Sequence, residues 1–521
     1  MQVLTYRRSV ASLLGLGLAA LAVGVYCWFH FTHAFTAQQH YKALPAEPIQ
    51  ASSEEVHRFC GACHAYPPPE TFPRSAWKKE VRQGYDFFQY STLSIRPPAL
   101  ESVVRYYQSR APEDLLIDPP ANSTSPPKGH LQKETMEIPG AESSPAISNV
   151  NLVHLYDERK LDLLTCDMNT GSIMVMKPYD EAPSYKILGT VPHPAHAEVV
   201  DLDGDGIKDI LVASLGSFNP TDAKCGSVVW LRGRPDGSFT PITLLKGVGR
   251  VADVQAADFR GTGKLDLVVA VFGWRTTGET LFLENQTTDW NEPKFVPHIL
   301  DDRHGAIHIC VANLNNDRKL DFVSLISQEH ETIVAFLNEG AGTFRKEIIY
   351  TAPHPAYGSS GIQLVDINGD GKLDVLYTNG DTLDLPALVK PYHGVQWLEN
   401  KGSFPFEHHP ITALPGAMRA VAADFRGEGQ MDVVAVSYLA KENFPDREQR
   451  GLDSVVLLEQ TTPGTFVRHS LEMGTCDHMS CVAGSWDGDN SIHLAVGNFS
   501  MSPRSKQLHP VSFWKNQGKS R

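Results

Sequence analysis

Residues 199–214 read VVDLDGDGIKDILVAS, and residues 364–380 read LVDINGDGKLDVLYTNG. In both stretches an apolar run enters a turn rich in Asp and Gly, and a second apolar run leaves it. β-Branched and aromatic side chains favour strands, whereas Asp and Gly favour the tight turn between them. Each stretch therefore predicts a β-hairpin whose turn carries several carboxylates.

The same plan recurs along the chain. Five further copies share it, at 152–167, 256–273, 311–327, 422–438 and 483–499. A third strand and a closing strand follow each hairpin, so the chain holds seven units of about 53 residues each. Four short strands per unit, repeated in this way, predict a mostly β fold, a seven-bladed β-propeller over residues 143–517.

These units resemble the FG-GAP/VCBS repeats, the blade type of integrin α-subunit heads and of many bacterial exported proteins. The resemblance covers residues from about 143 to 515 and rests on the Asp-x-Asp/Asn-Gly-Asp-Gly-x-x-Asp core of the turns. It implies the propeller fold and bound calcium. It implies almost nothing about the partner or the reaction.

Two turns carry a complete set of oxygen ligands for calcium, which takes six or more oxygens at about 2.3–2.6 Å. The first set comprises Asp201, Asp203, Asp205, the carbonyl of Ile207, and Asp209. The second set comprises Asp366, Asn368, Asp370, the carbonyl of Lys372, and Asp374. The sequence therefore predicts about two Ca²⁺ ions, each of which clamps the turn of one blade. The alternative role is calcium-dependent docking of a partner.

In two other copies an arginine stands where the second calcium ligand would be. Arg260 and Arg426 occupy this position, and Asp266 and Asp432 close the same two turns. A guanidinium pairs well with carboxylates. These two turns are therefore predicted to hold an ion pair in place of a metal.

Polar residues recur about five positions before the turns, on segments that enter the innermost strands. The set comprises His196, Glu198, Asp253, His304, His308, Arg419, His478 and Met479. Innermost strands converge on the central channel of a propeller, so these side chains are candidates for a pocket at its mouth. The candidate catalytic residues are His196, Asp253, His308, Arg419 and His478, with His196 or His308 as the base. The alternative is that these side chains only line a water-filled channel.

Residues 60–64 read CGACH, the order found where haem c is attached covalently. Each thiol adds to a haem vinyl group, and the histidine ligates the iron. The motif predicts one haem c held by Cys60 and Cys63, with His64 as an axial ligand. The alternatives are a thioredoxin-like redox pair or half of a zinc site.

Residues 45–112 are predicted to form a small α-helical module around this motif. Ser52 or Ser53, followed by two glutamates, marks a helix start, and a second helix is expected over 74–88. The segment resembles the cytochrome c family, with the haem motif on the first helix and a last helix of the form E-x-V-V-x-Y-Y-x-S.

The module departs from the cytochrome c family in its second axial ligand, which that family usually supplies as a methionine. No Met or His occurs from Ala65 to Gly129, which leaves Met136, His130 or a propeller loop as candidates. Residues 113–142 are rich in Pro, Ser and Thr, and they are predicted to form a linker.

The N-terminus predicts a membrane anchor. Residues 9–29 carry no charge, and as a helix they would span roughly 32 Å, enough for a transmembrane helix. Arg7 and Arg8 place residues 1–8 in the cytoplasm by the positive-inside rule. The bulk of the chain then lies on the periplasmic side of the cytoplasmic membrane. A cleaved signal sequence, which would leave an exported soluble protein, is the alternative.

Three functions fit these features, and whether the chain is an enzyme stays open. The net charge of −14 argues against a nucleic-acid partner. Electron transfer between haem c and a redox partner protein is the favoured function. The next is a calcium-stabilised propeller that binds a protein or polysaccharide as a scaffold, with an unknown ligand. The last is a propeller oxidoreductase that uses haem c as its internal electron acceptor.

Overall fold

The computed structural model describes residues 50–117, 131–134, 144–181, 183–384, 387–501 and 509–517. The predicted anchor at 9–29 lies outside these residues. No helix within the described ranges is both long and apolar enough to cross a membrane. The chain divides into two compact units, and Cys60–Ala76 belongs to the second unit together with Arg110–Arg521.

The first unit is helical, as the sequence predicts. It contains α2 (Ser53–Cys60) up to Phe59, α3 (Trp77–Tyr90) and α4 (Leu100–Gln108). The Ser52 hydroxyl accepts a hydrogen bond from the Glu55 N–H (3.2 Å), and the Glu55 carboxylate accepts one from the Ser52 N–H (2.8 Å). This reciprocal capping box starts α2 at the expected residues.

The core of the helical unit is aromatic. Trp77 of α3 stacks on Tyr107 of α4, with ring centroids 3.8 Å apart. Phe59 meets Phe88 edge to face, with ring centroids 5.1 Å apart. Burial of these large rings holds three short helices together, because helices of this length are marginal in water when isolated.

Gly84 offers a test of this unit, because it lies exposed in the middle of α3 and a Cβ added there meets nothing within 4 Å. Gly84→Ala is expected to stabilise the helical unit by about 0.5–1 kcal/mol, since alanine loses less backbone entropy on folding. Hydrogen exchange of the α3 amides measures the effect, with the propeller amides as the internal control. Faster exchange in α3 would contradict the described packing.

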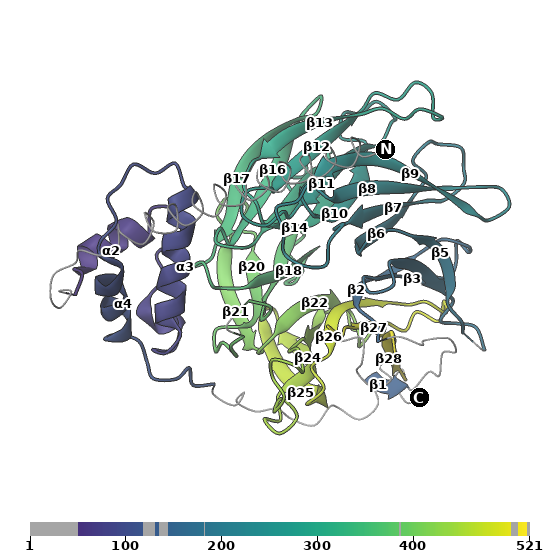
Figure 1. The fold of residues 1–521 in the computed structure, drawn as a ribbon. Helices are drawn as coiled ribbons and strands as arrows, with labels where there is room; N and C mark the ends of the chain where they lie inside the picture. The colour runs from purple at the N-terminus through teal and green to yellow at the C-terminus, as the bar shows by residue number, and fades with distance from the viewer. Residues whose placement is uncertain are drawn as a thin grey trace, which may run out of the picture. The chain divides into compact units, whose positions relative to one another are not determined.

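The second unit is a seven-bladed β-propeller, which confirms the prediction. Seven four-stranded antiparallel sheets surround a centre, and β2, β6, β10, β14, β18, β22 and β26 are the innermost strands (Figure 1). The first three blades contain β2 (Ile147–Val153), β3 (Asp162–Asp167), β4 (Ser172–Met176), β5 (Lys186–Thr190), β6 (Pro194–Val200), β7 (Asp209–Ser214), β8 (Gly226–Gly233), β9 (Phe239–Val248), β10 (Val251–Ala257), β11 (Asp266–Val271), β12 (Glu279–Asn285) and β13 (Phe295–Asp301). The next three contain β14 (Ala306–Ala312), β15 (Asp321–Ile326), β16 (Thr332–Gly340), β17 (Thr343–Thr351), β18 (Ser359–Val365), β19 (Asp374–Asn379), β20 (Gly394–Glu399), β21 (Glu407–Ala413), β22 (Ala417–Ala423), β23 (Asp432–Ser437), β24 (Asp453–Thr462) and β25 (Thr465–Met473). The seventh blade contains β26 (His478–Gly484), β27 (His493–Asn498), β28 (Val511–Asn516) and β1 (Leu131–Glu134).

The core lies between neighbouring blades. The second strand of every blade is buried along its whole length, because each blade packs between two others. Between the second and third blades, for example, Trp230, Val254 and Leu267 share one cluster. Strands buried on both faces read as continuous apolar runs, which is why the repeats were visible in the sequence.

The seventh blade closes the ring with a strand from a distant part of the sequence. β1 pairs antiparallel with β28, from Leu131 opposite Asn516 to Glu134 opposite Phe513. The predicted linker at 113–142 is therefore wrong for residues 131–134. The sequence LQKE is too short and too polar to show a strand pattern, and its partner lies almost at the other end of the chain.

The antiparallel order assigns the connections to two opposite faces of the propeller. The turns between first and second strands, such as 201–208, lie on one face, which we call the turn face. The loops between second and third strands, and those between blades, lie on the other face, which we call the loop face.

Candidate functional site

A ring of seven equivalent residues surrounds the central channel. Each is the third residue of an innermost strand and follows a register shift: Asn149, His196, Asp253, His308, Gly361, Arg419 and Ser480. The strand register therefore brings four of the five candidate catalytic residues together, since neighbouring blades present the same position to the channel.

Asp253 is the centre of this cluster. One oxygen, Oδ1, lies 2.8 Å from Nδ1 of His196, and the other, Oδ2, accepts a hydrogen bond from the Ile309 N–H at 2.7 Å. Asp253 is 1% exposed, so both contacts form away from water. A buried carboxylate in this setting is stabilised only as long as its partners remain.

His308 is held as a neutral imidazole. Its Nδ1 accepts a hydrogen bond from the Ile362 N–H (3.1 Å) and lies 2.8 Å from Arg419 Nη1, and its Nε2 lies 3.0 Å from Arg419 Nη2. Burial, followed by the Arg419 charge, lowers the pKa of His308 well below its usual value. Nδ1, which a catalytic base would need free, is therefore already in use.

The other charges in the cluster balance one another. Burial alone would raise the pKa of Asp253, but His196 and then His308 lower it to about 2. Burial opposes a charge on His196, yet Asp253 outweighs it and raises the pKa of His196. Burial raises the pKa of neighbouring Glu198 to about 7. The pair of His196 and Asp253 is thus charged in mildly acidic solution.

Gly361 lets Arg419 reach His308 across the blade between them. A Cβ added at Gly361 would lie 3.1 Å from Arg419 Cδ and 3.2 Å from the Met418 carbonyl oxygen. Gly361→Val is therefore expected to displace Arg419 and to lower the free energy of unfolding by about 1–3 kcal/mol. Urea unfolding measures the loss, and the His308 ring shifts in NMR spectra should change with it. Unchanged His308 shifts would show that the glycine does not make room for Arg419.

His478 lies two residues before the ring position of its blade. It is the first residue of β26, and its ring contacts Glu472 (3.0 Å) and Asn498 (2.7 Å). The equivalent residue in this blade is Ser480, since Gly484 pairs with His493 as Val200 pairs with Asp209. Counting from the first turn position of each repeat, rather than from the nearest aspartate, would have found it.

The first predicted calcium turn gathers three of its carboxylates. Ligand oxygens of Asp201, Asp203 and Asp209 lie within 4.8 Å of one another. Oδ1 of Asp201 is buried and has no hydrogen-bond partner, which fits a role as a cation ligand. Arg232 lies 2.5 Å from Asp203 and supplies part of the positive charge. Asp205 is exposed, and it and the Ile207 carbonyl stay predicted ligands.

The second predicted turn is more fully satisfied by the protein itself. Asp366 accepts hydrogen bonds from the N–H groups of Gly369 and Gly371, both at 2.8 Å. Asp370 pairs with Lys372 at 2.7 Å, and Asn368 donates to Glu399 at 2.8 Å. Calcium at this turn, with Asp374 and the Lys372 carbonyl, stays a prediction.

The closing aspartate of each turn has a structural task that does not depend on metal. Asp209 accepts hydrogen bonds from the N–H groups of Leu202 (3.0 Å) and Gly233 (2.7 Å). Asp374 does the same with Ile367 (3.2 Å) and Asn400 (2.8 Å). The buried carboxylate ties the turn to the end of the third strand, so its recurrence does not by itself indicate calcium.

The two arginine turns hold ion pairs, as predicted. Arg260 binds both oxygens of Asp266 through Nε, each at 3.0 Å, and Glu284 through Nη1 at 2.7 Å. Arg426 binds Asp432 with Nε at 3.0 Å and Nη2 at 2.9 Å. The guanidinium replaces a cation in both turns.

The predicted haem segment presents the side chains that haem c attachment uses. Cys60 is the last residue of α2, and Cys63 is exposed three residues later. Nδ1 of His64 lies 2.8 Å from the Ala65 carbonyl oxygen, which leaves Nε2 for a metal. The two thiols and the His64 imidazole therefore fit haem c. His130 and Met136, two candidates for the second axial ligand, lie outside the described residues.

The segment Cys60–Ala76 contacts the loop face within the propeller unit. Tyr392 donates a hydrogen bond to the Thr71 carbonyl oxygen (3.3 Å), and Lys390 lies 6.0 Å from the centre of the Phe72 ring. Burial, followed by the charge of Glu329, raises the pKa of Cys63.

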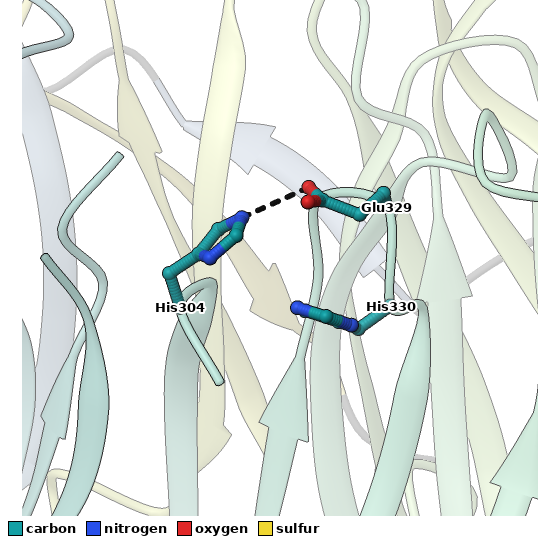
Figure 2. Close-up of side chains that lie close together, drawn as sticks. All are labelled: His304, Glu329 and His330. Atoms are coloured by element: carbon teal, nitrogen blue, oxygen red, sulfur yellow. Dashed lines mark hydrogen bonds and ion pairs between the residues drawn. The ribbon is translucent and has the colours of Figure 1, made fainter. Parts of the chain in front are cut away.

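Glu329 and His330 form a cluster with His304 that the sequence did not reveal (Figure 2). His304 Nε2 lies 2.9 Å from Glu329 Oε2. Burial opposes the Glu329 charge, but the His304 hydrogen bond outweighs it and lowers the pKa of Glu329 to about 2. Burial lowers the pKa of His330 to about 4. In the sequence, Glu329 and His330 are adjacent residues in the connection between two strands, a pattern too common to indicate a site.

Comparisons with known proteins agree with the propeller repeats. A family model described as FG-GAP-like repeat matches residues 201–269 and 313–377, which fall in the second to fifth blades. Cartilage acidic protein 1 of Homo sapiens is 21% identical over 389 residues, which cover 71% of this chain. The chain spans about half (55%) of that relative's length. The matched repeat residues do not include Cys60–His64.

A solved structure, that of the V. cholerae biofilm matrix protein Bap1, is 12% identical. The superposition covers 75% of this chain and 92% of that chain, with a TM-score of 0.38. A similarity this loose says nothing about function.

Proposed function

We propose that this chain of FG-GAP-like repeats is a binding module, in which a calcium-stabilised propeller holds a protein or polysaccharide partner outside the cytoplasm. The observation that carries the proposal is the uneven length of its connections. On the loop face, the connections between second and third strands differ widely from blade to blade, from 168–171 in the first blade to 438–452 in the sixth. On the turn face, the turns between first and second strands are short and regular, for example 201–208 and 424–431, and the connections between third and fourth strands extend only from 341–342 to 286–294.

Insertions gathered on one face of a repeat array are typical of a binding surface, because a rigid scaffold positions variable loops. The ring at the channel supports the scaffold role. Four of its side chains pair with one another inside the propeller: His196, Asp253, His308 and Arg419. This pairing weighs against the propeller oxidoreductase, since Arg419 contacts both ring nitrogens of His308, a candidate base.

The test is a binding screen of the full chain, purified in detergent, against polysaccharides and purified envelope proteins. Each partner is measured again with 215–225 replaced by a Gly-Ser linker of equal length. The control replaces 235–238, the exposed turn between the third and fourth strands of the second blade, on the turn face. We expect the first replacement to weaken binding at least tenfold and the second to leave it unchanged. Equal effects, or binding by neither chain nor variant, would contradict the proposal.

Electron transfer by haem c is the second candidate, and the His64 geometry favours it. Cys60 and Cys63 would hold the haem covalently, and His64 Nε2 would ligate its iron. Bound haem would supply a one-electron redox centre. The chain's own contribution is the hydrogen bond from His64 to the Ala65 carbonyl, which fixes the ring and its tautomer.

A pyridine haemochrome spectrum tests this candidate on protein produced together with haem c maturation enzymes. We expect a covalent haem c band in the native chain and none in a Cys60→Ser/Cys63→Ser double variant. A native chain without the band would remove the electron-transfer candidate. The binding proposal would remain.

A further inference from the structure

His304, Glu329 and His330 converge on one point of the loop face. Figure 2 shows the three side chains directed toward one another from two separate loops. One potential ligand atom from each residue lies within 4.8 Å of the other two. His304 comes from the connection between β13 and β14, and the other two residues come from the connection between β15 and β16.

The two loops are fixed to each other by their backbones. Ser327 donates to the Gly305 carbonyl oxygen from its N–H at 2.8 Å and from its hydroxyl at 3.1 Å. Gly278 packs directly behind His304, because a Cβ there would lie 2.5 Å from His304 Cα. These contacts position His304 beside the second loop without help from a ligand.

The second loop is pinned at its far end. The buried carboxylate of Glu331 accepts hydrogen bonds from the N–H groups of Gly358 (2.8 Å) and Ser359 (2.9 Å). Gln328 and Glu331 both have positive φ, 58° and 41°, a conformation that costs free energy for residues other than glycine. The strained loop presents Glu329 and His330 side by side toward His304, which favours a preorganised site.

We propose that His304, Glu329 and His330 bind a divalent transition-metal ion, with zinc as the first candidate. Two imidazoles and one carboxylate are the ligands that zinc takes when it keeps a fourth position open. Zinc bonds of about 2.0–2.1 Å in a tetrahedron place ligand atoms about 3.4 Å apart. The present spacing reaches this arrangement by small side-chain rotations, in which the hydrogen bond from His304 to Glu329 is exchanged for metal bonds.

Nitrogen ligands separate this site from the calcium turns on the opposite face. Calcium selects oxygen, whereas imidazole suits zinc, copper, iron and nickel. A second cluster, Glu399, Glu407 and His409, offers one imidazole and two carboxylates, and a lysine already neutralises part of its negative charge. Lys401 already binds Glu399 at 2.6 Å, so a cation is in place there.

Isothermal titration with Zn²⁺ tests the proposal on the full chain with saturating Ca²⁺. The chain carries Cys60→Ser and Cys63→Ser so that thiols do not compete for the metal. We expect one equivalent of Zn²⁺ to bind, and affinity to fall by at least about 100-fold in His304→Ala and in His330→Ala. His409→Ala, in the second cluster, is the matched control and should bind Zn²⁺ as the parent does.

Co²⁺ provides a second measurement that does not depend on heat. Its visible absorption should show a site with nitrogen and oxygen ligands, and Glu329→Gln should change that spectrum while the thermal midpoint stays within a few degrees. Zinc binding that survives His304→Ala and His330→Ala would overturn the site. The site would also be overturned if zinc failed to bind and His304→Ala altered the spectrum of haem-loaded chain, because the imidazole would then belong to the haem iron.

Discussion

Replacing Asp253 by alanine is expected to lower the free energy of unfolding by about 3–5 kcal/mol, because it breaks a buried charge pair. Asp253 contacts His196 on one side at 2.8 Å and holds the Ile309 N–H on the other at 2.7 Å. Its removal leaves a buried imidazolium and a buried N–H without partners. Urea unfolding followed by tryptophan fluorescence measures the loss. Asp302→Ala, an exposed carboxylate between β13 and β14, is the control and should change stability by less than about 0.5 kcal/mol.

The effect of Asp253→Ala should depend on pH in a defined way. The pKa of Asp253 is lowered to about 2 in the folded chain. Its contribution to the free energy of unfolding is therefore present above the unfolded pKa of about 3.9 and is lost as pH falls toward 2. The pKa of His196 is raised in the folded chain. Its contribution to the free energy of unfolding is therefore present below the unfolded pKa of about 6.5 and is lost as pH rises through the folded pKa. The difference between wild type and variant should therefore be largest from about pH 4 to about pH 6.5. A difference that kept growing above this window would contradict the charged pair.

Leu131→Asp is expected to open the ring of blades and to lower the free energy of unfolding by about 3 kcal/mol or more. Leu131 is buried in the cluster between the sixth and seventh blades, and it begins the strand that completes the seventh sheet. A carboxylate there has no partner and would force β1 off β28. Chemical unfolding and limited proteolysis near residue 131 report the opening.

Gln132→Asp is the matched control, because it adds the same charge one residue along the same strand. Gln132 is exposed, whereas the preceding residue, Leu131, is buried. The control should cost less than about 0.5 kcal/mol. Equal losses in Leu131→Asp and Gln132→Asp would mean that β1 does not close the propeller.

The propeller could be predicted from the sequence because its signal is local and repeated. An apolar strand, an Asp/Gly turn and a second apolar strand recur at a regular spacing, and each second strand is buried on both faces. The ion pairs of Arg260 and Arg426 were also accessible, since both partners lie within one turn. Helix α2 was marked by its capping residues.

The features that the sequence did not reveal are formed by long-range contacts. β1 is four residues long and gains its strand character only from β28, a partner near the other terminus. Ser480 replaces His478 in the channel ring because a register shift near the start of β26 decides which side chain faces inward. The cluster of His304, Glu329 and His330 joins two loops whose spacing is fixed by the bond between Gly305 and Ser327. The pairing of β1 and the three-residue cluster have no period that a single sequence displays, whereas Ser480 lies at the same distance from its turn as the other ring residues.

The most direct test of a calcium-stabilised propeller is the thermal midpoint of the EGTA-treated chain as Ca²⁺ is added, compared with Asp201→Asn and Asp258→Asn. Asp201 has an unpartnered buried oxygen in the predicted calcium turn, whereas Asp258 lies in the turn that Arg260 fills with an ion pair. Ca²⁺ at about 100 times its dissociation constant should stabilise the native chain by about 2.7 kcal/mol. Asp258→Asn should be stabilised by the same amount. In Asp201→Asn the calcium-dependent rise should be largely lost. A native midpoint that does not respond to Ca²⁺, or an equal response in Asp201→Asn, would show that calcium at this turn does not stabilise the propeller.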